Sequence, residues 1–176
     1  MNFEAMNLFL SEGNIKRHLE HLREKRLCYS ILEKSIPALC NVSMNEIFKL
    51  NIDREIKNDA LSLLWYIKSH ECFFDSFSTK QSLKNISGIC AEKLLYEIYT
   101  EAMKKDQGFL FVLLDKQGSP RITFSNGNDG SFIKYAPLLA LDLYEHTYFL
   151  DYGFDKKRFL QNAISHLNIS SLDKRG

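Results

Sequence analysis

A long amphipathic segment near the N-terminus places the strongest constraint on the fold. From Ile15 to Ile36 the residues of one stripe recur at steps of three and four, which is the period of one helix face. Asn14 is the predicted N-cap, and Pro37 is expected to stop the helix. The first third of the chain is therefore predicted to be helical. The stripe consists of Ile15, His18, Leu22, Lys25, Tyr29, Leu32 and Ile36.

Three further helical segments are predicted between residues 43 and 104. Residues 43–46 spell Ser-Met-Asn-Glu, a capping-box pattern that begins a short helix. Residues 55–72 form the next amphipathic helix, and residues 88–104 form another. The polar residues 76–80 between them are typical of a linker. We therefore expect an N-terminal helical lobe over residues 1–76 and a second lobe over residues 77–176.

The second lobe changes from helical to strand character. Residues 108–114 are an aromatic and β-branched run, a turn follows at 115–118, and 121–125 is the expected return strand. Residues 137–143 are continuously apolar up to Asp142, which is typical of a buried strand. A last helix is predicted over 154–167. Helices followed by three strands and a helix indicate the α+β class.

Charge and hydrophobicity exclude several function classes. Lys and Arg number 23 against 22 Asp and Glu, so the formal net charge is +1. A nucleic-acid clamp usually needs a clearly basic face, so we expect no nucleic-acid partner. No apolar run approaches the roughly 20 residues that cross a bilayer, so we expect no membrane partner.

The cysteines and the N-terminus favour a cytoplasmic location. The N-terminal residues show no basic region followed by a long apolar stretch, so a secretory signal is not expected. The cysteines are spread widely with no C-x-x-C pair, which makes a zinc ribbon or a redox dithiol unlikely and favours reduced thiols. They are Cys28, Cys40, Cys72 and Cys90.

Asp142 and two histidines are the candidates for chemistry. Asp142 closes an apolar strand, where an unpaired carboxylate costs several kcal/mol, so a metal ion or a buried arginine is expected beside it. His146 follows four residues later. The alternative is an aspartate that caps the next turn beside a hydrogen-bonded core histidine. His70, alone in its helix, is either a ligand or a histidine bonded to the backbone.

The segment from Pro137 to Tyr152 closely resembles the C-terminal signature of the iron/manganese superoxide dismutases, whose core is D-x-W-E-H-x-Y. Here the core is Asp-Leu-Tyr-Glu-His-Thr-Tyr, residues 142–148. Residues 108–113 resemble the family's G-W-x-W-L-V strand, and Ser125-Asn-Gly127 its S-N-x loop. Over residues 10–168 the resemblance implies an N-terminal helical hairpin and an α/β lobe with a three-stranded antiparallel sheet.

The same resemblance implies a metal site of three imidazoles, one carboxylate and a solvent molecule. Asp142, His146 and His70 match ligand positions of the family. The first helix offers two candidates for the remaining position, His21 and His18. Nitrogen and oxygen donors in this number suit one iron or manganese ion per chain.

The first-helix ligand is assigned to His21 because the family places this histidine eight residues before a gateway tyrosine. His21 and Tyr29 have that spacing. The alternative, His18, matches the pattern upstream of the ligand, with Ser11 seven residues before it, and would place Arg26 at the tyrosine position.

The resemblance implies that the chain converts superoxide to dioxygen and hydrogen peroxide. It also implies a homodimer in which Glu145 reaches across the interface. Tyr29 and Tyr66 are the tyrosines with implied catalytic roles. Tyr66 stands where iron-type members carry a solvent-binding glutamine, and Gly127 where manganese-type members do. The alternative function is therefore a metal-binding protein of this fold with weak or lost activity and a regulatory or binding role.

Basic residues of the first helix have two interpretations. Arg23, Lys25 and Arg26 lie near the expected mouth of the site, where they would steer an anionic substrate. The simpler interpretation is a solvated helix face, since Glu20 and Glu24 are interspersed among them.

Overall fold

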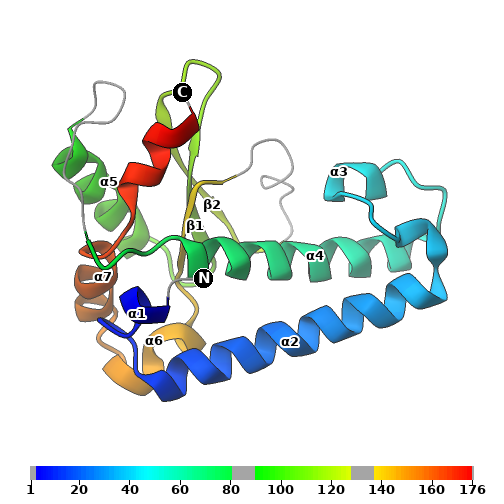
Figure 1. Cartoon of the computed structure of the whole chain (residues 1–176), viewed down its shortest axis with the longest axis horizontal. Helices are drawn as coiled ribbons and strands as arrows, with labels where there is room; N and C mark the ends of the chain where they lie inside the picture. Colours follow the sequence, from blue (N-terminus) through cyan, green and yellow to red (C-terminus); the bar gives the residue numbers. More distant parts are fainter. Residues whose placement is uncertain (1–2, 81–89, 128–136, 176) are drawn as a thin grey trace.

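The computed structural model describes residues 3–80, 90–127 and 137–175 (Figure 1). Two long helices, α2 and α4, lie side by side as a hairpin, and the short helix α3 lies toward its far end (Figure 1). The sheet and the later helices gather at the opposite end, beside the start of α2. The N-terminal elements are α1 (Phe3–Met6), α2 (Glu12–Ser35), the 3-10 turn η1 (Pro37–Leu39), α3 (Met44–Ile47) and α4 (Arg54–Asp75).

Helix α2 begins earlier than its pattern predicts. Ser11, not Asn14, is the N-cap, and its hydroxyl accepts the backbone N–H of Asn14 at 3.3 Å. Asn14 is instead fully buried on the inner face of the helix. The helix ends at Ser35, ahead of Pro37, as expected. The capping box of α3 is confirmed.

The sheet has three antiparallel strands in the order β2-β1-β3, which confirms the α+β class. They are β1 (Phe109–Leu114), β2 (Pro120–Ser125) and β3 (Leu139–Asp142). Strand β3 is buried throughout, and α4 packs against it. Asp142 is paired with Phe109 at the beginning of β1. The end of β3 therefore delivers a buried carboxylate to the side of α4.

The C-terminal helices surround the sheet. They are α5 (Ala91–Met103), α6 (Glu145–Tyr152), α7 (Lys156–Ile164) and the 3-10 segment η3 (Ile169–Arg175). The start of the helix predicted over 88–104 falls partly outside the described residues. Helix α6 was not predicted as a helix. In the described part of the chain, no helix combines the length and the apolarity needed to cross a membrane. The lobe boundary between residues 76 and 77 stays a prediction.

Ser76 fastens the end of α4 to the outer edge of β3. Its hydroxyl donates to the carbonyl of Cys72 at 2.7 Å and accepts the N–H of Ala140 at 2.7 Å. Both Ser76 and Ala140 are buried. This link holds the helix that carries His70 against the strand that carries Asp142.

We expect Ser76→Ala to lower the free energy of unfolding by about 1–3 kcal/mol, because the buried N–H of Ala140 loses its acceptor. Urea denaturation of the metal-free protein measures this difference. Ser165→Ala is the matched control, because the Ser165 hydroxyl donates to Asn162 on an exposed surface. Equal changes in the two variants would contradict a structural role for the Ser76 link.

Candidate metal centre

Four side chains from four different elements meet at one point in the core. His18 comes from α2, His70 from α4, Asp142 from the end of β3 and His146 from the first turn of α6. One possible ligand atom from each residue lies within 4.8 Å of all the others. The Asp142 Oδ2 atom lies 3.1 Å from Nε2 of His18 and 3.5 Å from Nε2 of both His70 and His146.

These spacings fit a single ion held by all four groups. Nitrogen and oxygen ligands bind transition metals at about 2.0–2.2 Å, so two ligands of one ion lie roughly 3.0–3.7 Å apart. The Nε2 atoms of His70 and His146 are buried and have no hydrogen-bond partner among the residues that the structure describes. Such orphaned lone pairs are what a metal ion would occupy. Cys72 is not one of the four clustered residues, and burial raises the pKa of its thiol to about 12.

His70 is held in the orientation that a metal ligand requires. Its Nδ1 lies 2.9 Å from the backbone carbonyl of Tyr66, one turn earlier on α4. Because a carbonyl only accepts, Nδ1 carries the proton and Nε2 presents its lone pair to Asp142. Burial lowers the pKa of His70 to about 4, so the imidazole is neutral at physiological pH.

Asp142 is ionised and fixed at both oxygens. Its Oδ1 accepts the backbone N–H of Tyr144 at 2.9 Å, which leaves Oδ2 toward the three imidazoles. Burial acts to raise the pKa of Asp142, but contacts with His146 and His18 lower it below its ordinary value. The carboxylate is completely buried, so it supplies a negative charge where a cation would be held.

Of the two histidines considered in the first helix, the structure places His18 in the cluster and His21 outside it. The structure brings together His70, Asp142 and His146, as predicted, but His21 lies outside the cluster with a half-exposed side chain 3.3 Å from Glu24. His18 is 2% exposed and contacts Asp142. The signal was present in the sequence, because His18 belongs to the buried stripe of α2 and His21 does not.

Tyr29 does not serve the cluster either. Its hydroxyl donates to the carbonyl of Leu39 at 3.5 Å, which lies at the turn after α2. Burial raises the pKa of this phenol, and the charge of Glu33 adds to the effect. Tyr29 therefore packs within the far end of the hairpin, and a gateway role there is not supported.

Tyr66, in contrast, lies directly against the cluster. Its ring stacks on the imidazole of His70 with 3.9 Å between ring centres. Burial, followed by the charge of Asp142, raises the pKa of Tyr66 well above its ordinary value, so the phenol stays protonated at neutral pH. The other side of Tyr66 lines a cavity of about 250 Å³ that Lys25 also lines. The Lys25 ammonium lies 5.6 Å from the centre of the Tyr66 ring.

The loop glycine at position 127 cannot supply a replacement for the absent glutamine. Gly127 has φ +114°, a conformation that disfavours any side chain, and a Cβ there would meet the indole of Trp65 at 3.6 Å. Trp65 in turn packs edge-on against Phe109. The positive φ thus disfavours a side chain at this loop position, and the Trp65 indole lies at van der Waals contact from it.

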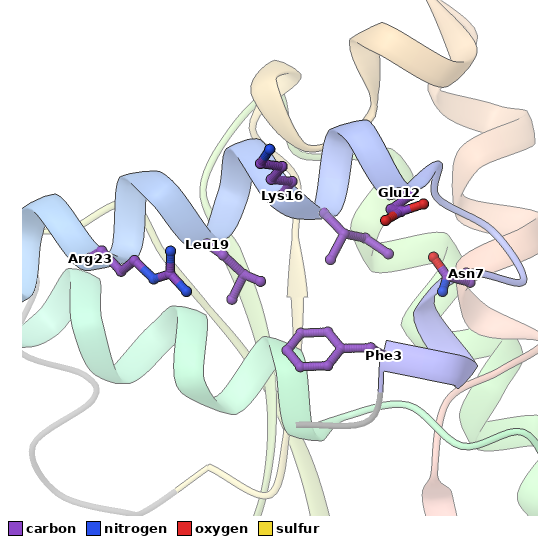
Figure 2. Close-up of a pocket in the computed structure, with 7 residues that line it drawn as sticks. Phe3, Asn7, Glu12, Lys16, Leu19 and Arg23 are labelled. Carbon is purple, nitrogen blue, oxygen red and sulfur yellow. The ribbon is translucent and has the colours of Figure 1, made fainter.

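The basic residues of α2 fall on different sides of the hairpin. Arg26 forms an ion pair with Glu71 at 2.8 Å, which joins α2 to α4. Arg23 lines a separate hollow of about 360 Å³ between α1 and α2. Figure 2 shows Arg23 beside Leu19, with the ring of Phe3 across from them. Of the three basic residues considered for steering, Lys25 alone lines the cavity beside Tyr66.

Comparison with known proteins concerns the C-terminal half of the chain. Residues 89–175 match the model of the iron/manganese superoxide dismutases, C-terminal domain. The matched segment includes the sheet and two members of the cluster, Asp142 and His146. His18 and His70 come from outside it. No curated protein matches the chain.

Proposed function

The chain belongs to the iron/manganese superoxide dismutase family, and we propose that it converts superoxide to dioxygen and hydrogen peroxide at a mononuclear iron or manganese site. The observation that carries the proposal is the convergence of three imidazole nitrogens on one buried carboxylate oxygen, at 3.1–3.5 Å. His18, His70, Asp142 and His146 would hold the ion. The set contains no thiolate, which favours iron or manganese over softer metals.

A bound iron or manganese ion would supply one-electron exchange between two superoxide anions, so that one leaves as dioxygen and the other, with two protons, as hydrogen peroxide. The chain's own residues then have three tasks. Asp142 offsets the positive charge of the ion, and the carbonyl of Tyr66 keeps the lone pair of His70 directed inward. The aromatic rings of Phe73 and Phe109, which pack on His18 and His70, exclude bulk water from the cluster.

Substrate access and proton supply are assigned to the cavity beside Tyr66. Lys25 attracts a small anion into that cavity, since opposite charge raises the local concentration of superoxide. Tyr66 lines the cavity and stacks on His70, and its phenol is protonated at neutral pH, so it can donate a hydrogen bond to an anion there. Tyr66 thereby takes the place of the glutamine that the family uses.

A homodimer is proposed through the face that carries α6. Glu145 is exposed and stands beside the partly exposed His146. The adjoining surface is apolar: Phe149 is 45% exposed, Leu150 52% and Phe154 84%. The rings of Phe149 and Phe154 contact edge to face at 5.1 Å. Clustered exposed apolar side chains favour association, and a second copy is the occupant that family membership supports.

A cytoplasmic location is also proposed. Cys28, Cys40, Cys72 and Cys90 are all free thiols in the structure. Unpaired cysteines are typical of proteins in reducing compartments.

A second function is favoured by one specific observation, the absence of the solvent-binding glutamine. Tyr66 and Gly127 occupy the two positions at which family members carry that glutamine. The reduction potential of a bound ion would therefore differ from that in active family members. The alternative proposal is a protein that retains the metal, lacks efficient turnover and acts by binding.

The proposed function is tested by measuring metal content and superoxide dismutation on one preparation of the wild-type protein. We expect about one iron or manganese ion per chain by elemental analysis, together with superoxide dismutation above that of the free metal. Sedimentation equilibrium should give twice the chain mass of 20.5 kDa. Stoichiometric metal without activity would exclude the enzyme and favour the alternative. Protein that cannot be loaded with metal would contradict both.

A further inference from the structure

Near the contact of α2 with α6, three buried polar atoms find no hydrogen-bond partner within the described part of the chain. They are Oδ1 of Asn14, Nδ1 of His18 and Oγ1 of Thr147. The three residues are at most 2% exposed. Buried polar groups are nearly always paired, so each of these atoms requires an explanation. The four-residue cluster accounts for none of them, because the His18 atom that faces Asp142 is Nε2.

The orientation of the Asn14 amide is determined by its donor side. The Nδ2 atom lies 2.8 Å from the carbonyl of Thr147 and 2.9 Å from Oδ2 of Asp151. Both are acceptors, so the group that faces them must be the NH₂. The free oxygen of Asn14 is consequently an acceptor without a donor.

His18 supplies the matching donor. If Nε2 gives its lone pair to a metal ion, the proton of the neutral ring resides on Nδ1. That N–H is buried and lacks an acceptor. Asn14 precedes His18 by four residues, so the two side chains lie on the same face of α2, one turn apart. An orphaned acceptor thus stands one turn from an orphaned donor.

We propose that Asn14 is a positioning residue for His18, a role that rests on the proposed metal centre. The two atoms form no direct hydrogen bond in the structure, so the Thr147 hydroxyl or one buried water would carry the bond from the Nδ1–H to the Asn14 Oδ1. This bond holds the tautomer and the ring angle that direct Nε2 toward the ion. A buried water with about three polar neighbours is a common component of protein interiors.

Three variants separate positioning of His18 from docking of α2 on α6. Asn14→Leu removes the acceptor and both donor contacts at nearly constant shape. Asn14→Asp keeps an oxygen acceptor and loses the donors. Asp151→Ala removes one docking bond and leaves the Asn14 oxygen in place. The probe is Zn²⁺, whose dissociation constant is measured by competition with a chelating dye.

We expect Asn14→Leu to weaken Zn²⁺ binding by about 10–100-fold, the usual effect of removing the partner of a metal-bound imidazole. Asn14→Asp and Asp151→Ala should stay within about threefold of wild type, even where their unfolding free energy falls. Zn²⁺ affinity unchanged in Asn14→Leu, or equally weakened in Asp151→Ala, would overturn the role.

If Asn14→Leu does not fold, a measurement on the wild-type protein tests the role of Asn14 instead. In the Zn²⁺-loaded protein, the Nδ1 proton of His18 should exchange slowly with solvent by NMR, in contrast to the ring protons of the exposed His21. Exchange as fast as that of His21 would overturn the role of Asn14. Failure of the wild type to bind Zn²⁺ would instead overturn the metal centre, and this inference with it.

Discussion

Replacing His18 with alanine is expected to abolish stoichiometric binding of iron or manganese, whereas His21→Ala should bind as the wild type does. His18 brings its Nε2 to 3.1 Å from Asp142 in a fully buried position. Removing one of four ligands leaves an incomplete site, and even loss of a residue that only supports a ligand costs 10–100-fold in affinity. We therefore expect the affinity of His18→Ala to fall by more than about 100-fold.

His21→Ala is the matched control because both histidines are on α2 and only three residues apart. Metal content by elemental analysis is the measurement, after loading both variants under the same conditions. Circular dichroism verifies that each variant is folded. Loss of metal in His21→Ala with retention in His18→Ala would show that the metal does not bind at this cluster.

The choice between these two histidines shows what sequence can predict of the site. At 100° per residue, His21 lies only about 60° around the helix from His18, so the helical period alone does not separate the two. Their burial does, because His18 is 2% exposed and the side chain of His21 is half-exposed. The apolar stripe pointed to His18, while the spacing to Tyr29 pointed to His21. Spacing along one helix does not reveal which tyrosine faces the site, and Tyr29 turns out to bond Leu39.

Other parts of the site were predictable for local reasons. Asp142 closes an apolar strand, and a buried carboxylate demands partners, so its place in a polar cluster follows from the sequence. His146 follows at a fixed short distance. The pairing of Trp65 with Gly127 was not predictable, because it joins residues far apart in the chain through tertiary packing. Helix α6 was missed because its eight residues are too few to establish a period.

Tyr66→Phe is expected to lower the rate of superoxide dismutation by at least about tenfold while metal content stays at the wild-type level. The ring of Tyr66 keeps its stack on His70 in this variant, and the Tyr66 carbonyl still accepts from His70. Only the hydroxyl is lost, and a positioned proton donor commonly contributes 10²–10⁴-fold.

Tyr29→Phe is the matched control for that variant, because it removes a phenol from the same hairpin, away from the cluster. Its dismutation rate per bound metal ion should equal that of the wild type. Rates are compared at neutral pH, where Tyr66 is protonated because burial raises its pKa above the ordinary value. If Tyr66→Phe keeps the full rate, the hydroxyl supplies neither the proton nor the hydrogen bond. Neither Gly127 nor the Trp65 indole that packs on it carries a side-chain amide. Hydrogen bonding and proton supply, which the glutamine serves in the family, would then fall to solvent in the cavity that Lys25 and Tyr66 line.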